Sequence, residues 1–280
     1  MQLPGFIVDD VIRTALKEDI HYLDTTTDLM IPADARTTAC FMAKAEGVVC
    51  GLEVALRVFS FLDGTLKAEV ILPEGSRVKK GDCIARVEGL TRALLKGERT
   101  ALNLLQHMSG IATATARAVD QVRGTQAVIT DTRKTLPGLR ALQKYAVTVG
   151  GGKNHRFNLS DGAMLKDNHI DAAGGIPQAV AAIRRKLGHM VKLEVETRNL
   201  DEVQQALEAG ADIIMLDNMD CPTMAEAVRM AGGRVLLEAS GGIREDTLRA
   251  VAQTGVDIIS IGALTHSVQA LDISMKIQRS

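Results

Sequence analysis

Two neighbouring stretches of the sequence concentrate side chains that can hold a small anion. The first contains Arg133 and Lys134 and begins where the apolar run at 127–129 ends. The second follows three consecutive glycines and contains His155 and Arg156. The formal net charge of the whole chain is only −1, so the positive charge is concentrated locally. Such a concentration is typical of a pocket for a small, multiply charged anion.

Further polar or glycine-rich clusters end five later apolar runs. They are Lys166 with its neighbours to 169, Glu194 and Glu196, Asp217 and Asn218, residues 240–243, and residues 262–264. In a parallel β/α barrel the carboxyl ends of the strands share one face, which carries the active site, and the last two strand ends commonly bind phosphate. Glycines there let backbone N–H groups approach phosphate oxygens. The pattern therefore predicts an active site assembled from six strand ends.

The acidic residues of these clusters favour a metal site. Glu194 and Glu196 have the spacing of one strand face, and we favour Glu196 for the site because it is nearer the strand end. Asp217 lies between Leu216 and Asn218 and is a poor core residue. Since Mg²⁺ prefers a few carboxylates together with substrate phosphate, Glu196 and Asp217 form a plausible Mg²⁺ pair.

Each cluster also has a simpler explanation. Arg133 and Lys134 alone could be a solvated turn, because surface charge is usually unremarkable. One of the two glutamates could neutralise Lys192 or Arg198 at the surface. The convergence of several basic residues on one predicted face makes the functional interpretation the stronger one.

The elements that must position these residues alternate between strand and helix after residue 124. Apolar runs are expected as strands at 127–129, 163–165, 191–195, 212–216, 235–237 and 257–261. Helices are expected at 177–187, 200–209, 223–231 and 246–254, three of them closed by a left-handed glycine at 188, 210 or 255. Buried runs alternating with amphipathic helices indicate a parallel β/α architecture. We expect an irregular, partly open barrel of about six to seven strands.

The first part of the chain has a different rhythm. Helical spacing is found at 6–18, strand-like pieces separated by glycine turns at about 37–87, and a long apolar helix at 94–122. The pattern supports a small β-rich sandwich. We therefore predict an α/β protein with an N-terminal α/β sandwich domain at 1–110, a barrel domain at 111–265 and a C-terminal segment, 266–280, that packs back on the N-terminal domain.

Composition excludes several other classes of protein. Hydrophobic residues make up 46% and charged residues 24% of the 280 residues, as in ordinary globular proteins. The near-zero net charge and the 2% of aromatic residues argue against nucleic-acid and membrane-surface binding. No apolar run is long enough to span a membrane, and no signal peptide is recognisable. The four scattered cysteines form no C-x-x-C pair and fit a reducing compartment, so we expect a cytoplasmic protein.

The residues also carry a family resemblance that extends nearly end to end. The run D-T-R-K-T-L-P-G-L-R at 131–140 resembles quinolinate phosphoribosyltransferase, also called nicotinate-nucleotide pyrophosphorylase (carboxylating). Further matching runs are at 18–19, 24–26, 97–103, 109–113, 144–156, 165–170, 194–196, 215–218, 238–243 and 262–267. One small departure is Leu136, where many members have Thr.

The resemblance implies a reaction and a division of labour. Quinolinate and phosphoribosyl pyrophosphate would give nicotinate mononucleotide, pyrophosphate and CO₂ in NAD biosynthesis, within a homodimer whose active site is shared. Arg133, His155, Arg156 and Lys166 would hold the pyridine dicarboxylate, together with Arg99 from the neighbouring subunit and with Thr132 close by. Lys134, Glu196 and Asp217 would be the catalytic residues, with Glu196 and Asp217 facing the ribose and Mg²⁺ directly, through water or through substrate. The 5′-phosphate would be bound by Ser240, Gly241, Gly242, Ile261, Gly262 and Ala263.

Three alternatives stay open from the sequence. The first is a paralogue of the same fold associated with molybdate transport. The second is an aldolase-type barrel that forms a Schiff base on Lys166. The third is a carrier or binding module built on residues 72–87, which resemble the turns of biotinyl and lipoyl domains.

Overall fold

The chain divides into two compact units, which we describe separately. The structure, a computed structural model, describes residues 3–278. Unit 1 combines the described residues up to 116 with 135–151 and those from 264 onward, and unit 2 combines 117–134 with 152–263. The domain boundaries expected at 110 and 265 remain a prediction. Within residues 3–278, no helix is both long and apolar enough to cross a membrane.

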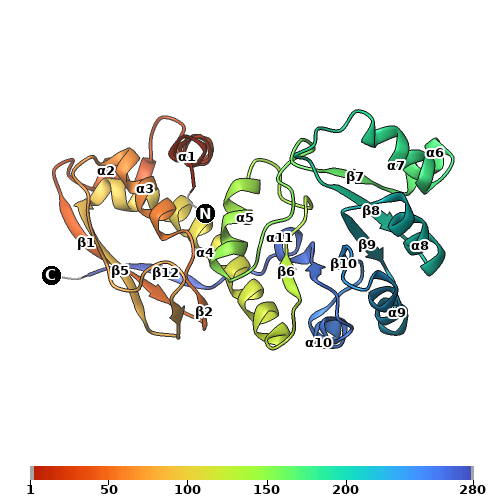
Figure 1. Cartoon of the computed structure of the whole chain (residues 1–280). Helices are drawn as coiled ribbons and strands as arrows, with labels where there is room; N and C mark the ends of the chain where they lie inside the picture. The colour runs from red at the N-terminus through yellow and green to blue at the C-terminus, as the bar shows by residue number, and fades with distance from the viewer. Residues whose placement is uncertain (1–2, 279–280) are drawn as a thin grey trace. The chain divides into compact units, whose positions relative to one another are not determined.

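Unit 1 is built on an antiparallel sheet of four strands in the order β12-β1-β5-β3 (Figure 1). Its strands are β1 (Arg36–Ala43), β3 (Lys67–Val70), β5 (Cys83–Leu90) and β12 (Ile273–Ile277), beside the small pair β2 (Gly47–Val48) and β4 (Arg77–Val78). Its helices are α1 (Gly5–Asp19), α2 (Thr25–Met30), α3 (Leu52–Leu62), most of α4 (Thr91–Val122), α5 (Arg140–Val149) and most of α11 (Ala263–His266). Strand β12 brings the end of the described chain back to β1.

The core of unit 1 follows from the alternation of side chains along β1. Phe41 points to the buried face, and its ring centroid lies 6.1 Å from that of Phe59 on α3. Gly97 of α4 lies so close to Phe59 that an added Cβ would be 2.9 Å from the ring. Only a glycine lets the two helices pack at this distance, which fixes α4 against the sandwich.

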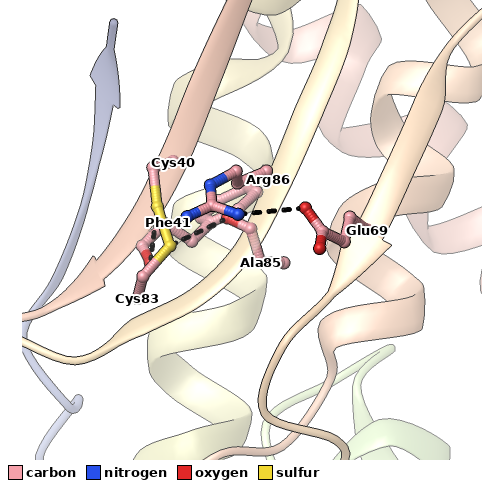
Figure 2. The surroundings of a disulfide bond; sticks show 6 residues. All are labelled: Cys40, Phe41, Glu69, Cys83, Ala85 and Arg86. Carbon is pink, nitrogen blue, oxygen red and sulfur yellow. Dashed lines mark hydrogen bonds and ion pairs between the residues drawn. A yellow bond between two sulfur atoms is a disulfide. The ribbon is translucent and has the colours of Figure 1, made fainter.

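The opposite face of the same sheet carries a disulfide bond between Cys40 of β1 and Cys83 of β5 (Figure 2). The two cysteines are 43 residues apart in sequence, and the antiparallel pairing of β1 with β5 brings them together. The sequence-based expectation that all four cysteines are unpaired thiols is therefore wrong for Cys40 and Cys83. Cys50 is a buried free thiol and Cys221 a half-buried one.

Unit 2 is built on six parallel strands in the order β6-β11-β10-β9-β8-β7. They are β6 (Val128–Thr130), β7 (Ala163–Leu165), β8 (Leu193–Thr197), β9 (Ile213–Asp217), β10 (Leu236–Ser240) and β11 (Ile258–Ser260). The helices between them are α6 (Asp167–Ala173), α7 (Ile176–Arg184), α8 (Leu200–Ala209), α9 (Cys221–Ala231) and α10 (Glu245–Gln253). Helix α8 contacts both β8, which it follows, and β9, which it precedes, and helix α9 contacts β10. No ladder joins β6 to β7 in the described chain, so the predicted partly open barrel is confirmed.

The predicted elements of unit 2 are confirmed to within a few residues, with one correction at α7, and the sequence pattern does not predict α5 of unit 1. Helix α7 ends at Arg184, and Gly188 does not adopt the left-handed conformation that Gly210 and Gly255 do. Helix α5 is not predicted from the sequence because it buries the polar residues Gln143 and Lys144, which hide the apolar period. Gln143 is satisfied inside unit 1, where its amide donates to the carbonyl of Thr265 at 2.9 Å.

Candidate functional site

Asp131 anchors the loop that follows β6. Its carboxylate is fully buried and accepts hydrogen bonds from the Asn154 side chain at 2.6 Å and from the His155 backbone N–H at 2.9 Å. Backbone pairing between Thr130 and Lys153 continues the same contact. The two basic stretches of the sequence, one after β6 and one at 153–156, are therefore fastened to each other inside unit 2.

Thr132, Arg133 and Lys134 form the turn beyond this anchor. The hydroxyl of Thr132 accepts a hydrogen bond from the backbone N–H of Lys134 at 3.0 Å, which is a local turn of the kind threonine favours. Thr132 and Arg133 are half-buried and Lys134 is exposed. The two adjacent basic side chains thus start from differently buried positions.

Arg156 is held by its own unit and lies within electrostatic reach of Arg133. Its guanidinium donates to the carbonyl of Gly162 at 3.0 Å and to the sulfur of Met164 at 3.4 Å. Burial, and then the charge of Arg133, lower the pKa of Arg156, while Glu194 and Asp161 oppose the shift. Two guanidinium groups that disfavour each other's charge are ready to accept an anion between or beside them.

Lys166 and Glu196 meet where β7 and β8 end. The Lys166 ammonium lies 2.9 Å from a carboxylate oxygen of Glu196. Lys166 follows β7 directly, and its side chain is half exposed, whereas the side chain of Glu196 is only 13% exposed. The Lys166 side chain is thus engaged by a carboxylate and keeps further N–H donors for an anionic ligand, whereas a Schiff-base nucleophile needs a neutral amine that is free to attack a carbonyl.

Asp217 lies on the same face of the sheet as Glu196. Glu196 is the register partner of Met215 on β9, and Asp217 is two residues further along that strand, so their side chains point to the same side. Ser240 of β10 is in turn the register partner of Asp217. Carboxylates and a hydroxyl therefore collect on three neighbouring strands at their carboxyl ends.

The glycines after β10 have both a conformational and a steric reason to be there. Gly241 and Gly242 adopt φ values of +88° and +60°, which other residues rarely take. A Cβ on Gly241 would lie 2.3 Å from the side chain of Asn218. Asn218 itself has a φ of +53° and donates its backbone N–H to Ser240 at 2.9 Å. The turn is thus closely packed and presents backbone rather than side chains.

The turn after β11 lies next to this one, because β10 and β11 are neighbours in the sheet. Ile261 donates its backbone N–H to the carbonyl of Thr130 at 3.0 Å, which ties the segment 261–263 to β6. The predicted phosphate-binding residues, Ser240, Gly241, Gly242, Ile261, Gly262 and Ala263, are accordingly grouped at two adjacent strand ends.

A second, deeper group of acids was not assigned a role from the sequence. Nε2 of His155 lies 3.2 Å from Glu194 and 3.5 Å from Glu238, whose side chains are only 6% and 2% exposed. One oxygen of each carboxylate is buried without a hydrogen-bond partner in the described structure. The three residues line a cavity of about 290 Å³ that also reaches Ile213 and Ile258 at the starts of β9 and β11. This group therefore lies toward the opposite, amino-terminal end of the strands.

Burial and a neighbouring charge set the protonation of the deeper group. Burial, and then the carboxylate of Glu194, raise the pKa of Glu238 to about 7, with His155 opposing the shift. The backbone N–H of Arg156 donates to Nδ1 of His155 at 2.8 Å, which assigns the ring proton to Nε2. The ligand atoms of His155, Glu194 and Glu238 lie within 4.8 Å of one another, close enough for a metal ion. A metal on Nε2 would have to displace that proton, so the contacts describe a hydrogen-bonded cluster.

The predicted site residues do not all lie together. Most of the predicted residues of unit 2 lie at or next to the carboxyl ends of its strands. His155 and Arg156 instead line the deeper cavity with Glu194 and Glu238, and Arg156 donates to Gly162 just before β7. Arg99 is exposed on α4 in unit 1. Asp131, Asn154, Glu194 and Glu238 were missed as positioning residues, although a period-two reading of β10 from Ser240 points to Glu238.

Comparisons with known proteins show which family the chain belongs to. A family model described as the C-terminal domain of quinolinate phosphoribosyl transferase matches residues 111–276, and one described as its N-terminal domain matches residues 24–109. The chain is 45% identical to a probable nicotinate-nucleotide pyrophosphorylase (carboxylating) of Bacillus subtilis, covering 94% of this chain and 91% of the relative. It is also 45% identical to nicotinate-nucleotide pyrophosphorylase (carboxylating) of Mycobacterium leprae, covering 96% of each.

Solved structures give the same result at the level of the fold. The crystal structure of NadC from Streptococcus pyogenes matches with a TM-score of 0.95 at 42% identity, covering 99% of this chain and 98% of the other. A nicotinate-nucleotide pyrophosphorylase structure from Francisella tularensis matches with the same TM-score at 41% identity and the same coverage.

Proposed function

The chain belongs to the quinolinate phosphoribosyltransferase family, and we propose that it transfers the phosphoribosyl group of phosphoribosyl pyrophosphate to quinolinate. The transfer is accompanied by decarboxylation and yields nicotinate mononucleotide, pyrophosphate and CO₂. The names of the relatives support this reaction and not that of the molybdate-associated paralogue. The Lys166–Glu196 ion pair weighs against the Schiff-base alternative, and 72–87 contributes β4 and part of β5, so it forms no separate carrier module.

One observation carries the proposal: cations, carboxylates and glycine turns collect at the carboxyl edge of a single sheet. Both substrates are polyanions, so a site for them needs cations on one side and backbone N–H groups on the other. Arg133, Arg156 and Lys166 are the cations we assign to the pyridine dicarboxylate, because arginine forks match carboxylates in bidentate geometry. Thr132 lies in the same turn as Arg133. For His155, this role requires the ring to exchange its contact with Glu194 for one with substrate.

The catalytic work we assign is electrostatic. Breaking the bond between C1 of the ribose and pyrophosphate leaves positive character on the ribose and negative charge on the leaving group. Glu196 and Asp217 would stabilise the cationic ribose, and Lys134 would neutralise charge on phosphoribosyl pyrophosphate. The glycine turns at 240–242 and 261–263 would bind the 5′-phosphate through backbone N–H groups. Positioning and charge thus replace any covalent intermediate with the protein.

Mg²⁺ is the metal that these carboxylates fit. Glu196 and Asp217 share one face on neighbouring strands, and both are accessible enough to take part with water and substrate oxygens. When bound, Mg²⁺ would neutralise the pyrophosphate leaving group. The pairing of Glu196 with Lys166 implies that the lysine has to release the carboxylate, or share it, when metal and substrates enter.

We further propose a homodimer in which Arg99 of one subunit completes the site of the other. Support comes from the exposure of Arg99 on α4 of unit 1 and from the family resemblance of the run at 97–103. We propose a cytoplasmic location from the class of reaction alone. The four cysteines no longer support it, because two of them form a disulfide.

The deciding experiment is a direct assay for nicotinate mononucleotide from quinolinate, phosphoribosyl pyrophosphate and Mg²⁺. Product should form with Mg²⁺ and be lost when the metal is chelated, and a folded protein that gives no product would sink the proposal. Arg133→Ala and Lys166→Ala should each abolish turnover while leaving the circular dichroism spectrum unchanged. For the shared site, mixing Arg99→Ala with Lys134→Ala subunits should restore some activity, and absence of rescue with mixing verified would count against it.

A further inference from the structure

The exposed face of the sheet in unit 1 has a cavity at the Cys40–Cys83 disulfide that the proposed reaction does not use. Its volume is about 430 Å³, and both cysteines lie in its wall. Figure 2 shows the disulfide itself, with Arg86 beside it. It is formed where β1, β5 and β12 lie side by side, with the turn at 79–82 at one end.

The wall of this cavity is strongly basic. Lys44, Lys80, Arg86 and Lys276 line it, and within the described chain no carboxylate does. Arg86 is paired with Glu69 at 3.1 Å, but the ammonium groups of the three lysines form no ion pair with a described residue. Asp82, the acidic residue next to Cys83 in the sequence, does not line the cavity. Its carboxylate accepts a hydrogen bond from the backbone N–H of Lys79 at 2.7 Å. Three lysines that have no ion pair among residues 3–278 thus line the cavity together with the disulfide.

A disulfide in a pocket of uncompensated positive charge attracts negatively charged thiols over neutral or cationic ones. Thiol–disulfide exchange requires a thiolate that can reach one of the sulfurs, and its rate rises with the local concentration of that thiolate. Cys83 is half-buried, whereas Cys40 is only 6% exposed, so Cys83 is the more exposed of the two cysteines and the one we expect a thiolate to attack. Cations near the leaving sulfur also stabilise the thiolate that departs.

We propose that this cavity is a binding and exchange site for small anionic thiols, and that the Cys40–Cys83 disulfide is reversibly thiolated there. The incoming thiolate forms a bond to the sulfur of Cys83, the Cys40–Cys83 bond breaks, and Cys40 leaves as a thiolate. A second thiolate then attacks the small-molecule sulfur of the mixed disulfide and releases Cys83 as a thiolate. The net change is reduction of one protein disulfide and oxidation of two small thiols to their disulfide.

The test compares thiols of different charge on the full chain prepared without reductant. Before any thiol is added, alkylation of the unfolded protein should label two cysteines, Cys50 and Cys221. The probes are 2-mercaptoethanesulfonate, 2-mercaptoethanol and cysteamine, which are anionic, neutral and cationic, and rates are expressed per thiolate present. Acid quenching followed by intact mass measurement reports the mixed disulfide, and peptide mapping should place it on Cys83.

The anionic probe should react about tenfold faster than the cationic one at low salt, and added salt should shrink the difference. In the double variant Lys44→Glu/Lys276→Glu, the anionic thiol should no longer react faster than the cationic one, or should react more slowly. Lys186→Glu, an exposed lysine of unit 2, makes one change of the same type away from the cavity and should keep the order. Equal rates for the three thiolates, an unchanged order in the double variant, or four alkylated cysteines at the start would each overturn the proposal.

Discussion

Glu194 and Glu196 are two residues apart on one strand and point to the same side of it, yet they have different surroundings. Glu196 lies at the carboxyl end, where it is partly exposed and paired with a lysine. Glu194 lies one layer deeper, where it is buried and meets a histidine and a second carboxylate. Asp217 and Glu238 repeat this contrast on β9 and β10. Depth along the strand therefore decides whether an acid can hold a cation for chemistry or has to share protons to stay buried.

The largest effect is expected for Asp217, an acid at a strand end whose loss should impair catalysis but not folding. Asp217→Asn should lower kcat by about a hundredfold or more, because it removes charge next to the developing cation of the ribose. The thermal midpoint should change little, since Asp217 is at a strand end. Steady-state kinetics and calorimetry check both parts, with the exposed Asp201→Asn on α8 as control. A kcat equal to that of the wild type in the Asp217→Asn variant would remove Asp217 from the site.

A change in the deeper group should act on stability instead. His155→Ala removes the donor that faces both buried carboxylates, so the free energy of unfolding should fall by about 3 kcal/mol. Urea unfolding measures the loss. If the variant is as stable as the wild type, the carboxylates find water or other partners in the cavity, and the cluster does not contribute to folding.

Glu238 should make the stability depend on pH in a defined direction. Its pKa is raised from 4.5 to about 7 in the folded chain, so the folded state binds its proton more tightly than the unfolded state does. Its contribution is full below pH 4.5 and is lost as the pH rises through about 7. The whole effect corresponds to roughly 3–4 kcal/mol.

Glu238→Gln should accordingly flatten the stability profile between pH 4.5 and 7 and raise the thermal midpoint above pH 7. Glu194→Gln is the companion variant: it removes the charge that helps to raise the pKa of Glu238, and so should move the window to lower pH. Profiles of the two variants that coincide with the wild type would show that Glu238 is ionised in the folded protein.

The smallest effect is expected for an ion pair that belongs to neither group. Arg198, which lies just before α8, pairs with Glu202 in the first turn of that helix, and the Arg198 side chain is 53% exposed. Arg198→Ala should cost about 0.3–0.5 kcal/mol, an amount that salt reduces further. A loss above about 1 kcal/mol by urea unfolding would mean that this surface pair is coupled to the site.

The sequence is most informative where burial and repetition leave a clear pattern. It places the strands of unit 2 within a few residues, because parallel strands are buried on both faces and are separated by amphipathic helices. It fails for α5, which buries polar residues, and for the short strands β4 and β12, where too few residues repeat to show a period. Most basic and acidic side chains of the site are recognisable because they end or follow an apolar run, whereas His155 and Arg156 follow three glycines.

The sequence by itself determined the strand–helix order, the residue types at each strand end and the family resemblance, since these depend on local pattern and composition. Only the tertiary structure decided which acids are deep and which are accessible, and that Cys40 and Cys83 meet. Both depend on register between strands distant in sequence. Register decides contacts through the alternation of faces, so a shift of one residue would exchange buried for exposed side chains.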